Sequence, residues 1–307
     1  MKILVCDTLN KKVLEELHSL GECIDISSSE SKDIDLVSEI SQAEIVVIRS
    51  ATKLTKELIE KGDNLKIIAR CGVGVDNIDV EYAKSKNIKV TNSPSANLIS
   101  VVELTVALII NASRKINLAD NHLKKGKWNR SEFIGMELSG KQLGIVGFGK
   151  AGRLVSERMK SFGMSIAFYD PYVKDWDGPE KSLGLDELLS SSDVVSIHVI
   201  KTKETENILS KEKLDLLKES AILINTSRGG VVEEDYLIEL LRLNKIFGAG
   251  LDVFSEEPPK NIENIGDINL ITTPHIGAST NEAQLKAGLD TIENIQKILA
   301  GDDSVAL

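Results

Sequence analysis

Short runs of aliphatic and β-branched residues alternate with amphipathic segments along most of this chain. In its N-terminal part, predicted strands at 3–6, 45–48 and 65–69 each precede a predicted helix. Strands separated by helices at this spacing form βαβ units, whose strands pair in parallel and whose helices cover both faces of the sheet. The alternation therefore predicts a doubly wound α/β fold.

A second series of the same kind begins at residue 142. Its predicted strands are 143–146, 165–169, 194–199, 221–224, 246–251 and 270–272. An apolar helix that opens at Ser100 precedes this series and a last helix that begins near Ser279 follows it, and both starts carry the Ser-x-x-Glu pattern of a capping box. We expect these helices to cross between two domains, one made of residues 1–97 and 279–307 and the other of residues 98–278.

Composition excludes several classes of protein. The chain has 307 residues, three cysteines and a net charge of −10, which rules out a disulfide mini-protein and argues against a nucleic-acid partner. No Cys/His spacing indicates a metal site. The longest apolar stretch, 98–112, contains Glu103 and is too short for a bilayer span, and Met1 leads directly into a strand instead of a signal peptide. We expect a cytoplasmic protein without a membrane partner.

The glycine-rich loop 147–152 follows a predicted strand and opens a predicted helix. In this context Gly147 makes the tight turn, Gly149 lets backbone N–H groups approach a pyrophosphate, and Gly152 packs the helix on the strand. Asp170 ends the next strand, 18 residues after Gly152, where an acid binds the ribose 2′-hydroxyl. Its carboxylate would repel a 2′-phosphate, so the predicted cofactor is NAD.

Three further ionisable residues each follow a predicted strand of the second series. They are Arg228, Glu257 and His275, and the carboxyl ends of parallel strands are where ligands bind. Arg228 can hold a carboxylate by a bidentate fork, His275 can exchange a hydroxyl proton, and Glu257 can orient the imidazole. The plainer alternatives are a strand cap for Arg228 and a solvated loop acid for Glu257, while His198 is typical of a core histidine.

The motifs at 147–152, 225–230, 251–258 and 273–280 resemble, in order and spacing, those of the D-isomer-specific 2-hydroxyacid dehydrogenases. The resemblance implies a flavodoxin-like substrate domain and a Rossmann NAD domain joined by two crossing helices. It implies that Arg228, Glu257 and His275 are catalytic, and that Asp252 binds the nicotinamide carboxamide. The residues expected to bind NAD are Gly147, Gly149, Lys150, Ala151, Gly152, Asp170, His198, Val199, Thr226, Ser227, Arg228, Asp252, His275, Gly277 and Ala278.

In the first domain, the motifs at 49–52 and 70–79 resemble the D-3-phosphoglycerate dehydrogenase branch of that family, in its short form without a regulatory domain. A substrate with a carboxylate and a phosphate needs two anion sites. The resemblance assigns the phosphate to Arg49. The residues expected to bind this small anionic substrate are Arg49, Ser50, Arg70, Val73, Gly74, Asn97, Arg228 and His275.

The predicted function is NAD-dependent oxidation of D-3-phosphoglycerate to 3-phosphohydroxypyruvate, the entry step of serine synthesis. A glyoxylate or hydroxypyruvate reductase is the first alternative, because it shares every catalytic residue. An NAD-sensing binding protein, similar to the co-repressors that have this fold, is the second. A formate dehydrogenase is disfavoured because that relative has Gln where Glu257 stands. The apolar helix at 101–112 and the resemblance both suggest a homodimer.

Overall fold

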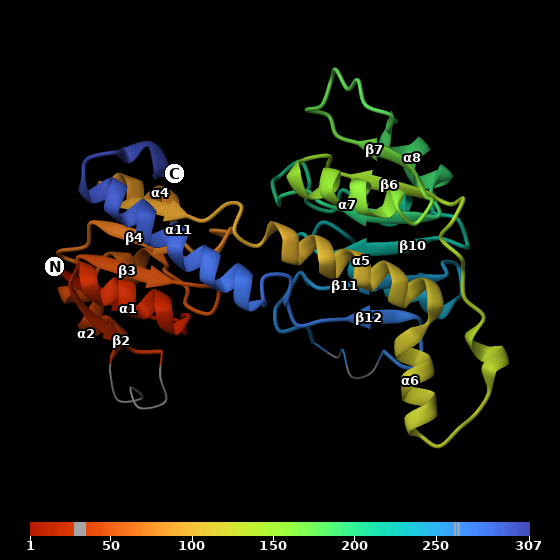
Figure 1. The fold of residues 1–307 in the computed structure, drawn as a ribbon, viewed down its shortest axis with the longest axis horizontal. Coiled ribbons are helices and arrows are strands. Elements are labelled where there is room, and N and C mark those ends of the chain that lie inside the picture. The colour runs from red at the N-terminus through yellow and green to blue at the C-terminus, as the bar shows by residue number, and fades with distance from the viewer. Residues whose placement is uncertain (28–34, 261, 263–264) are drawn as a thin grey trace. The chain divides into compact units, whose positions relative to one another are not determined.

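The computed structural model describes residues 1–27, 35–260, 262 and 265–307. The chain divides into two compact units, Met1–Ser100 with Ala278–Leu307, and Val101–Gly277. Each unit is built around one sheet whose strands all pair in parallel (Figure 1). The predicted doubly wound α/β fold is confirmed.

The sheet of the first unit has five strands in the order β2-β1-β3-β4-β5. This is the flavodoxin-like order, in which the order of successive strands reverses between β1 and β3. Ile3 of β1 pairs with Cys23 on one side and Ile45 on the other. The strands are β1 (Lys2–Val5), β2 (Glu22–Asp25), β3 (Ile45–Ile48), β4 (Ile67–Arg70) and β5 (Lys89–Asn92).

Helices cover both faces of this first sheet. α1 (Lys11–Leu20) and α11 (Asn281–Leu299) share one apolar cluster with the strands, and Gly288 of α11 leaves the space that Val13 of α1 occupies. The opposite cluster is covered by α2 (Leu36–Gln42), α3 (Lys56–Ile59) and α4 (Val80–Ser85), and the turn η4 (Asp303–Val305) lies beside β5. Burial on both faces explains why the central strands are continuous aliphatic runs.

The sheet of the second unit has the order β12-β11-β10-β9-β6-β7-β8. Counted from β6, this is the Rossmann order 3-2-1-4-5-6 with one more strand at the edge. The order of successive strands therefore reverses between β6 and β9. The strands are β6 (Gln142–Val146), β7 (Ser165–Tyr169), β8 (Lys181–Ser182), β9 (Val194–Ile197), β10 (Ile222–Asn225), β11 (Gly248–Leu251) and β12 (Leu270–Thr272).

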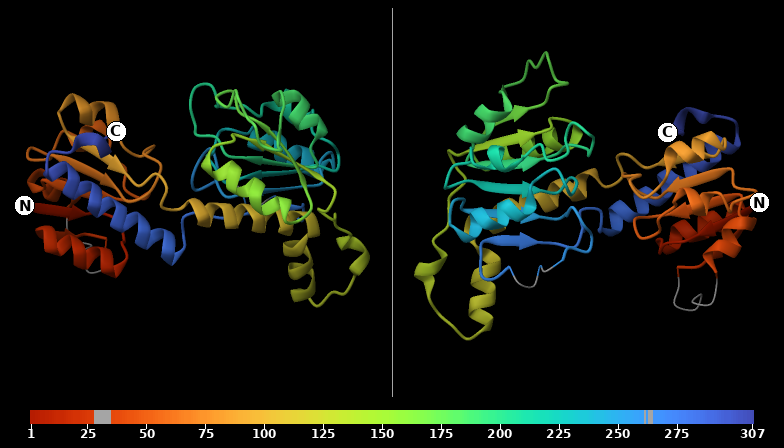
Figure 2. Two further views of the ribbon diagram at one scale, coloured as in Figure 1. Left: turned by 45° about the horizontal axis from the view of Figure 1, so that its top comes forward. Right: turned by 180° about the vertical axis from the view of Figure 1, so that it is seen from behind.

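Two helical layers also enclose the second sheet. α5 (Leu98–Arg114) and α7 (Lys150–Lys160) lie on the same side of it, where Ile109 and Val155 belong to one buried cluster (Figure 2). The other face is covered by α8 (Leu185–Ser191), α9 (Lys211–Leu214) and α10 (Glu234–Arg242). Within the described ranges, no helix combines the length and apolarity that crossing a bilayer would require.

Both predicted capping boxes were wrong, because neither Ser100 nor Ser279 is the N-cap of its helix. α5 begins at Leu98, so Ser100 lies inside the helix and its hydroxyl bonds the Thr280 hydroxyl at 2.7 Å. α11 is capped by Thr280, whose Oγ1 accepts from Ala283 N at 3.1 Å, and not by Ser279. Thr280 caps α11 although Ala283, and not a glutamate, stands three residues after it, so the short pattern alone does not identify the capping residue. The segment 115–141 contains α6 (Ile116–Lys124) and the turn η2 (Arg130–Phe133).

Candidate active site

The glycine-rich loop between β6 and α7 is shaped by close backbone contacts. Gly147 has φ +92°, and a Cβ there would lie 2.7 Å from the carbonyl oxygen of His198. A Cβ on Gly152 would lie 2.4 Å from the carbonyl oxygen of Gly147. Around Gly149, by contrast, no described atom lies within 4 Å of a Cβ position. Two glycines are therefore required by packing, and the third leaves open space at the N-terminus of α7.

Asp170 lies beside this loop, directly after β7. Its half-buried carboxylate accepts from Phe148 N at 2.8 Å and from Tyr172 N at 2.9 Å. The open space at Gly149, the helix N-terminus and this fixed carboxylate fit a dinucleotide, with the pyrophosphate at α7 and the ribose hydroxyls at Asp170. The loop residues Lys150 and Ala151 begin α7.

We expect the apoprotein to bind NADH at least about tenfold more tightly than NADPH, because the Asp170 carboxylate repels a 2′-phosphate. Asp170→Ala should weaken NADH binding and reduce this preference. Fluorescence titration with both cofactors measures the two dissociation constants without a substrate. Asp175→Ala removes an exposed acid five residues along and serves as the control. Equal NADH and NADPH affinities in the wild type would contradict the assignment.

His198 follows β9 and touches the loop through its backbone. Its imidazole is hydrogen-bonded to the Ser196 hydroxyl at 2.8 Å, and burial lowers the pKa of His198 to about 4. The ring is therefore neutral at pH 7. Val199 also packs against Gly147. The His198 backbone therefore contacts the cofactor loop, while its half-buried ring is bonded to Ser196.

The turn that carries Arg228, residues 225–230, is termed the Arg228 turn. Asn225 at the end of β10 accepts from Ser227 N at 3.0 Å and donates to the Arg228 carbonyl at 2.9 Å. The Arg228 guanidinium donates to the Ser227 carbonyl at 2.7 Å. The Thr226 hydroxyl is buried against Thr105 of α5 at 2.8 Å, so its backbone is the part that remains for a cofactor.

Glu257 and His275 are joined across two loops that follow β11 and β12. His275 Nδ1 lies 2.8 Å from one Glu257 oxygen, and Phe254 N donates to the other oxygen at 3.1 Å. A carboxylate on Nδ1 selects the tautomer whose Nε2 holds a lone pair. The imidazole is 46% exposed, so Nε2 can receive a proton from a bound substrate. The predicted pair is therefore present in the folded chain.

Asp252 anchors the loop that carries His275. Its 1% exposed carboxylate accepts from the Thr273 hydroxyl at 2.6 Å and from Ile276 N and Gly277 N, both at 2.8 Å. His275 N also donates to the Asp252 carbonyl at 2.9 Å. The described contacts of Asp252 hold the loop, while its predicted bond to the nicotinamide carboxamide stays a prediction.

The first unit contains its own cationic group. Arg49 follows β3 and Arg70 ends β4, and both guanidinium groups favour the thiolate of Cys71. Burial nevertheless outweighs them and raises the pKa of Cys71. The Arg70 guanidinium lies against Gly72, which has φ +149°, and the Asn92 amide holds the Val73 carbonyl at 2.6 Å. The two arginines thus lie at the carboxyl ends of neighbouring strands, beside the glycine-rich turn at 72–75.

Other predicted substrate residues are less directly connected to these arginines. Ser50 is exposed and Asn97 is half-buried before α5, and among the described contacts neither side chain bonds Arg49 or Arg70. Gly74 belongs to the turn after β4.

Sequence reasoning missed Asp7, which organises the turn 49–52 that follows β3. This buried residue follows β1, and its carboxylate accepts from Arg49 N and from the Thr52 hydroxyl, the latter at 2.7 Å. Asn77 adds bonds to the Arg49 and Thr52 carbonyls at 2.8 and 2.6 Å. An acid directly after a strand at the predicted ligand edge was the available signal.

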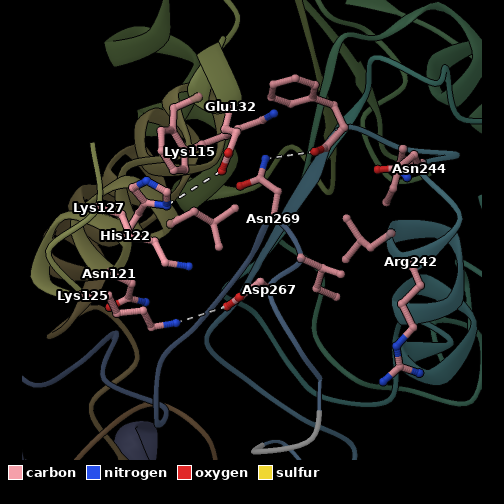
Figure 3. Close-up of a pocket in the computed structure, with 16 residues that line it drawn as sticks. Lys115, Asn121, His122, Lys125, Lys127, Glu132, Arg242, Asn244, Asp267 and Asn269 are labelled. Atoms are coloured by element: carbon pink, nitrogen blue, oxygen red, sulfur yellow. Dashed lines mark hydrogen bonds and ion pairs between the residues drawn. The ribbon is translucent and has the colours of Figure 1, made fainter. Parts of the chain in front are cut away.

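A cavity of about 400 Å³ lies in the second unit but away from these loops (Figure 3). Its wall includes Lys115, His122, Asp267 and Asn269. The wall residues 246–247 precede β11 and the wall residues 267–269 precede β12, whereas Glu257 and His275 follow these strands. The cavity therefore lies at the amino ends of the strands, opposite the candidate site. No cluster of His, Cys, Asp and Glu suited to a metal is present among the described residues.

The chain is similar to known proteins of one enzyme family. Residues 106–277 match the NAD-binding domain model of the D-isomer specific 2-hydroxyacid dehydrogenases. The chain is 44% identical over 98% of its length to D-3-phosphoglycerate dehydrogenase from Methanocaldococcus jannaschii, of which it spans 58%. It is 42% identical over 97% of its length to hydroxypyruvate reductase from Thermotoga maritima, covering 98% of that protein.

Among solved structures, D-lactate dehydrogenase from Aquifex aeolicus, complexed with NAD and lactic acid, is 32% identical with a TM-score of 0.85, covering 98% of this chain and 96% of that one. The chain belongs to the D-isomer specific 2-hydroxyacid dehydrogenase family. Its second unit is the NAD-binding domain of that family.

Proposed function

We propose that the protein oxidises D-3-phosphoglycerate to 3-phosphohydroxypyruvate with NAD, the first committed reaction of serine synthesis. The observation that carries the reaction class is the 2.8 Å Glu257–His275 pair. Glu257 follows β11, which lies beside the strand β10 that leads into the Arg228 turn, and His275 follows β12, on the other side of β11. The sequence similarity to D-3-phosphoglycerate dehydrogenase supports the substrate.

In the proposed reaction, the Arg228 guanidinium binds the substrate carboxylate and orients the neighbouring hydroxyl. His275 Nε2 takes the hydroxyl proton, and the Glu257 carboxylate stabilises the resulting imidazolium. NAD, when bound, would accept the hydride from the substrate carbon that bears this hydroxyl. In the reverse direction His275 returns the proton to the oxygen of the 2-oxo acid.

We assign the substrate phosphate to the first unit. Arg49 and Arg70 provide two permanent positive charges in a chain whose net charge is −10. Their shared influence on Cys71 supports a local positive potential at this edge of the sheet. The glycine-rich turn at 72–75 offers backbone N–H groups for a carboxylate.

A panel of 2-oxo acids tests the substrate assignment. With NADH, we expect 3-phosphohydroxypyruvate to be reduced with a higher kcat/KM than hydroxypyruvate or glyoxylate. Arg49→Ala should raise KM for the phosphorylated substrate roughly 10- to 100-fold, because it removes a charge-assisted hydrogen bond, and should leave hydroxypyruvate nearly unaffected. Lys12→Ala, which removes an exposed cation of the same unit, is the control. Equal specificity constants unaffected by Arg49→Ala would refute the phosphate assignment.

Hydroxypyruvate reduction is the second candidate. It is favoured by the Thermotoga maritima relative, which matches this chain over nearly the full length of both. A panel in which hydroxypyruvate has the highest kcat/KM would establish this alternative with the same catalytic residues.

We also propose that the protein is a cytoplasmic homodimer. Large apolar side chains are exposed in and after α6, with Trp128 at 79% and Ile134 at 73%. Exposed aromatic and aliphatic groups of this kind are typical of subunit interfaces. Three free cysteines fit a reducing compartment. Sedimentation equilibrium of the wild type and of Trp128→Ser measures the proposed assembly.

A further inference from the structure

Glu234, the first residue of α10, connects two turns of the candidate active site. One is the Arg228 turn, and the other, residues 253–257, is termed the Glu257 turn. The half-buried Glu234 carboxylate accepts from Ser255 N at 2.7 Å and from Gly230 N at 3.4 Å through Oε1. Its Oε2 accepts from the Ser255 hydroxyl at 2.9 Å. One side chain thus bonds both turns.

The two turns are also in direct backbone contact. A Cβ on Gly229 would lie 1.8 Å from the Phe254 carbonyl oxygen and 2.6 Å from Ser255 N. Consecutive amides of the Glu257 turn bind two different carboxylates, since Phe254 N donates to Glu257 and Ser255 N donates to Glu234. A displacement of Ser255 would therefore move the amide that fixes Glu257.

The partial burial of Glu234 makes its hydrogen bonds to Ser255 and Gly230 necessary. Burial raises the pKa of Glu234, while its bonds to Ser255 and Gly230 oppose this effect. A carboxylate withdrawn from water is stable only when hydrogen bonds replace its hydration. Its neighbour Asp235 lies on the same helical turn but is exposed.

We propose that Glu234 is a positioning residue that fastens the Arg228 turn to the Glu257 turn and so keeps Glu257 aligned with His275. The inference rests on the proposed function, because it assigns those turns to substrate binding and proton transfer. Glu234 itself touches neither reacting group. It acts through Ser255 and Gly230, and it is required as a hydrogen-bond acceptor.

Three variants separate this role from a general effect on folding. Glu234→Ala removes all three bonds, and we expect kcat/KM for the preferred 2-oxo acid to fall roughly 10- to 100-fold, since small misplacements of reacting groups cost this much. Glu234→Gln keeps an acceptor for the two amides and can donate to the Ser255 hydroxyl, so it should stay within about threefold of wild type. Asp235→Asn should match the wild type. NADH affinity and the thermal midpoint are measured for each.

A spectroscopic readout tests the inference without turnover. The chain has four histidines, so the imidazole ¹⁵N shifts of His275 can be assigned by their loss in His275→Gln. Above the titration range of imidazole, wild type should show the Nδ1–H tautomer that Glu257 selects. Glu257→Ala defines the released state, and Glu234→Ala should shift His275 toward it. Ser255→Ala, which removes one bond, should have a smaller effect and serves if Glu234→Ala does not fold.

The outcomes distinguish this inference from the proposed function. An unchanged tautomer together with an unchanged kcat/KM in Glu234→Ala overturns the positioning role. A lower thermal midpoint with wild-type activity per folded molecule also overturns it. A wild type inactive with every 2-oxo acid refutes the proposed function, and the tautomer measurement then still decides whether Glu234 aligns the Glu257–His275 pair.

Discussion

His275→Gln is expected to lower kcat for 2-oxo acid reduction by about 10²- to 10⁴-fold, the range contributed by a positioned general acid or base. Glutamine fills much of the imidazole volume but does not release or take up a proton at neutral pH. The pyrophosphate and ribose contacts that we propose for NAD lie on the glycine-rich loop and Asp170, so loss of the His275 ring should leave NADH affinity within about twofold. Steady-state kinetics and NADH fluorescence titration measure the two quantities.

His198 does not provide a substitute acid in this variant. Burial lowers its pKa to about 4, and its ring is bonded to Ser196. His18→Gln, on the exposed face of α1, is the matched control and should retain full activity. A kcat for His275→Gln within tenfold of wild type would show that another group transfers the proton.

The strand and helix pattern predicted most of this fold because burial on both faces of a parallel sheet leaves a clear sequence signal. Continuous aliphatic runs such as 45–48 became central strands, and each candidate catalytic residue follows a strand. Helix starts were predicted less well. Ser100 and Ser279 satisfy a cap pattern locally, but the choice among neighbouring residues depends on contacts such as Ser100–Thr280, which join distant segments.

The supporting residues of the candidate site were harder to predict than the residues to which we assign its chemistry. Arg228, Glu257 and His275 belong to chemically distinctive motifs. Asp7 and Glu234, by contrast, are acids whose importance arises from the amides they face, and those amides belong to segments far away in the sequence. The intrinsic chemistry of a carboxylate does not reveal whether it faces water or a distant backbone N–H group.

Gly229→Ala is expected to impair the enzyme more than any other single methyl group added to the Arg228 turn. The new Cβ would lie 1.8 Å from the Phe254 carbonyl oxygen and 2.0 Å from its carbon. Both are backbone atoms of the Glu257 turn, so relief requires the two turns to separate. We expect kcat/KM to fall about 100-fold or more through misplacement of Arg228 relative to Glu257, with a lower thermal midpoint.

Gly184→Ala is the matched control, because no described atom lies within 4 Å of a Cβ there and the residue precedes α8 in an extended conformation. It should keep wild-type kcat/KM. NADH binding to Gly229→Ala separates the two effects, since the glycine-rich loop at 147–152 is not part of the clash. Retained NADH affinity with lost turnover would locate the damage in the contact between the two turns, whereas full activity would mean that this contact is not needed to align the catalytic residues.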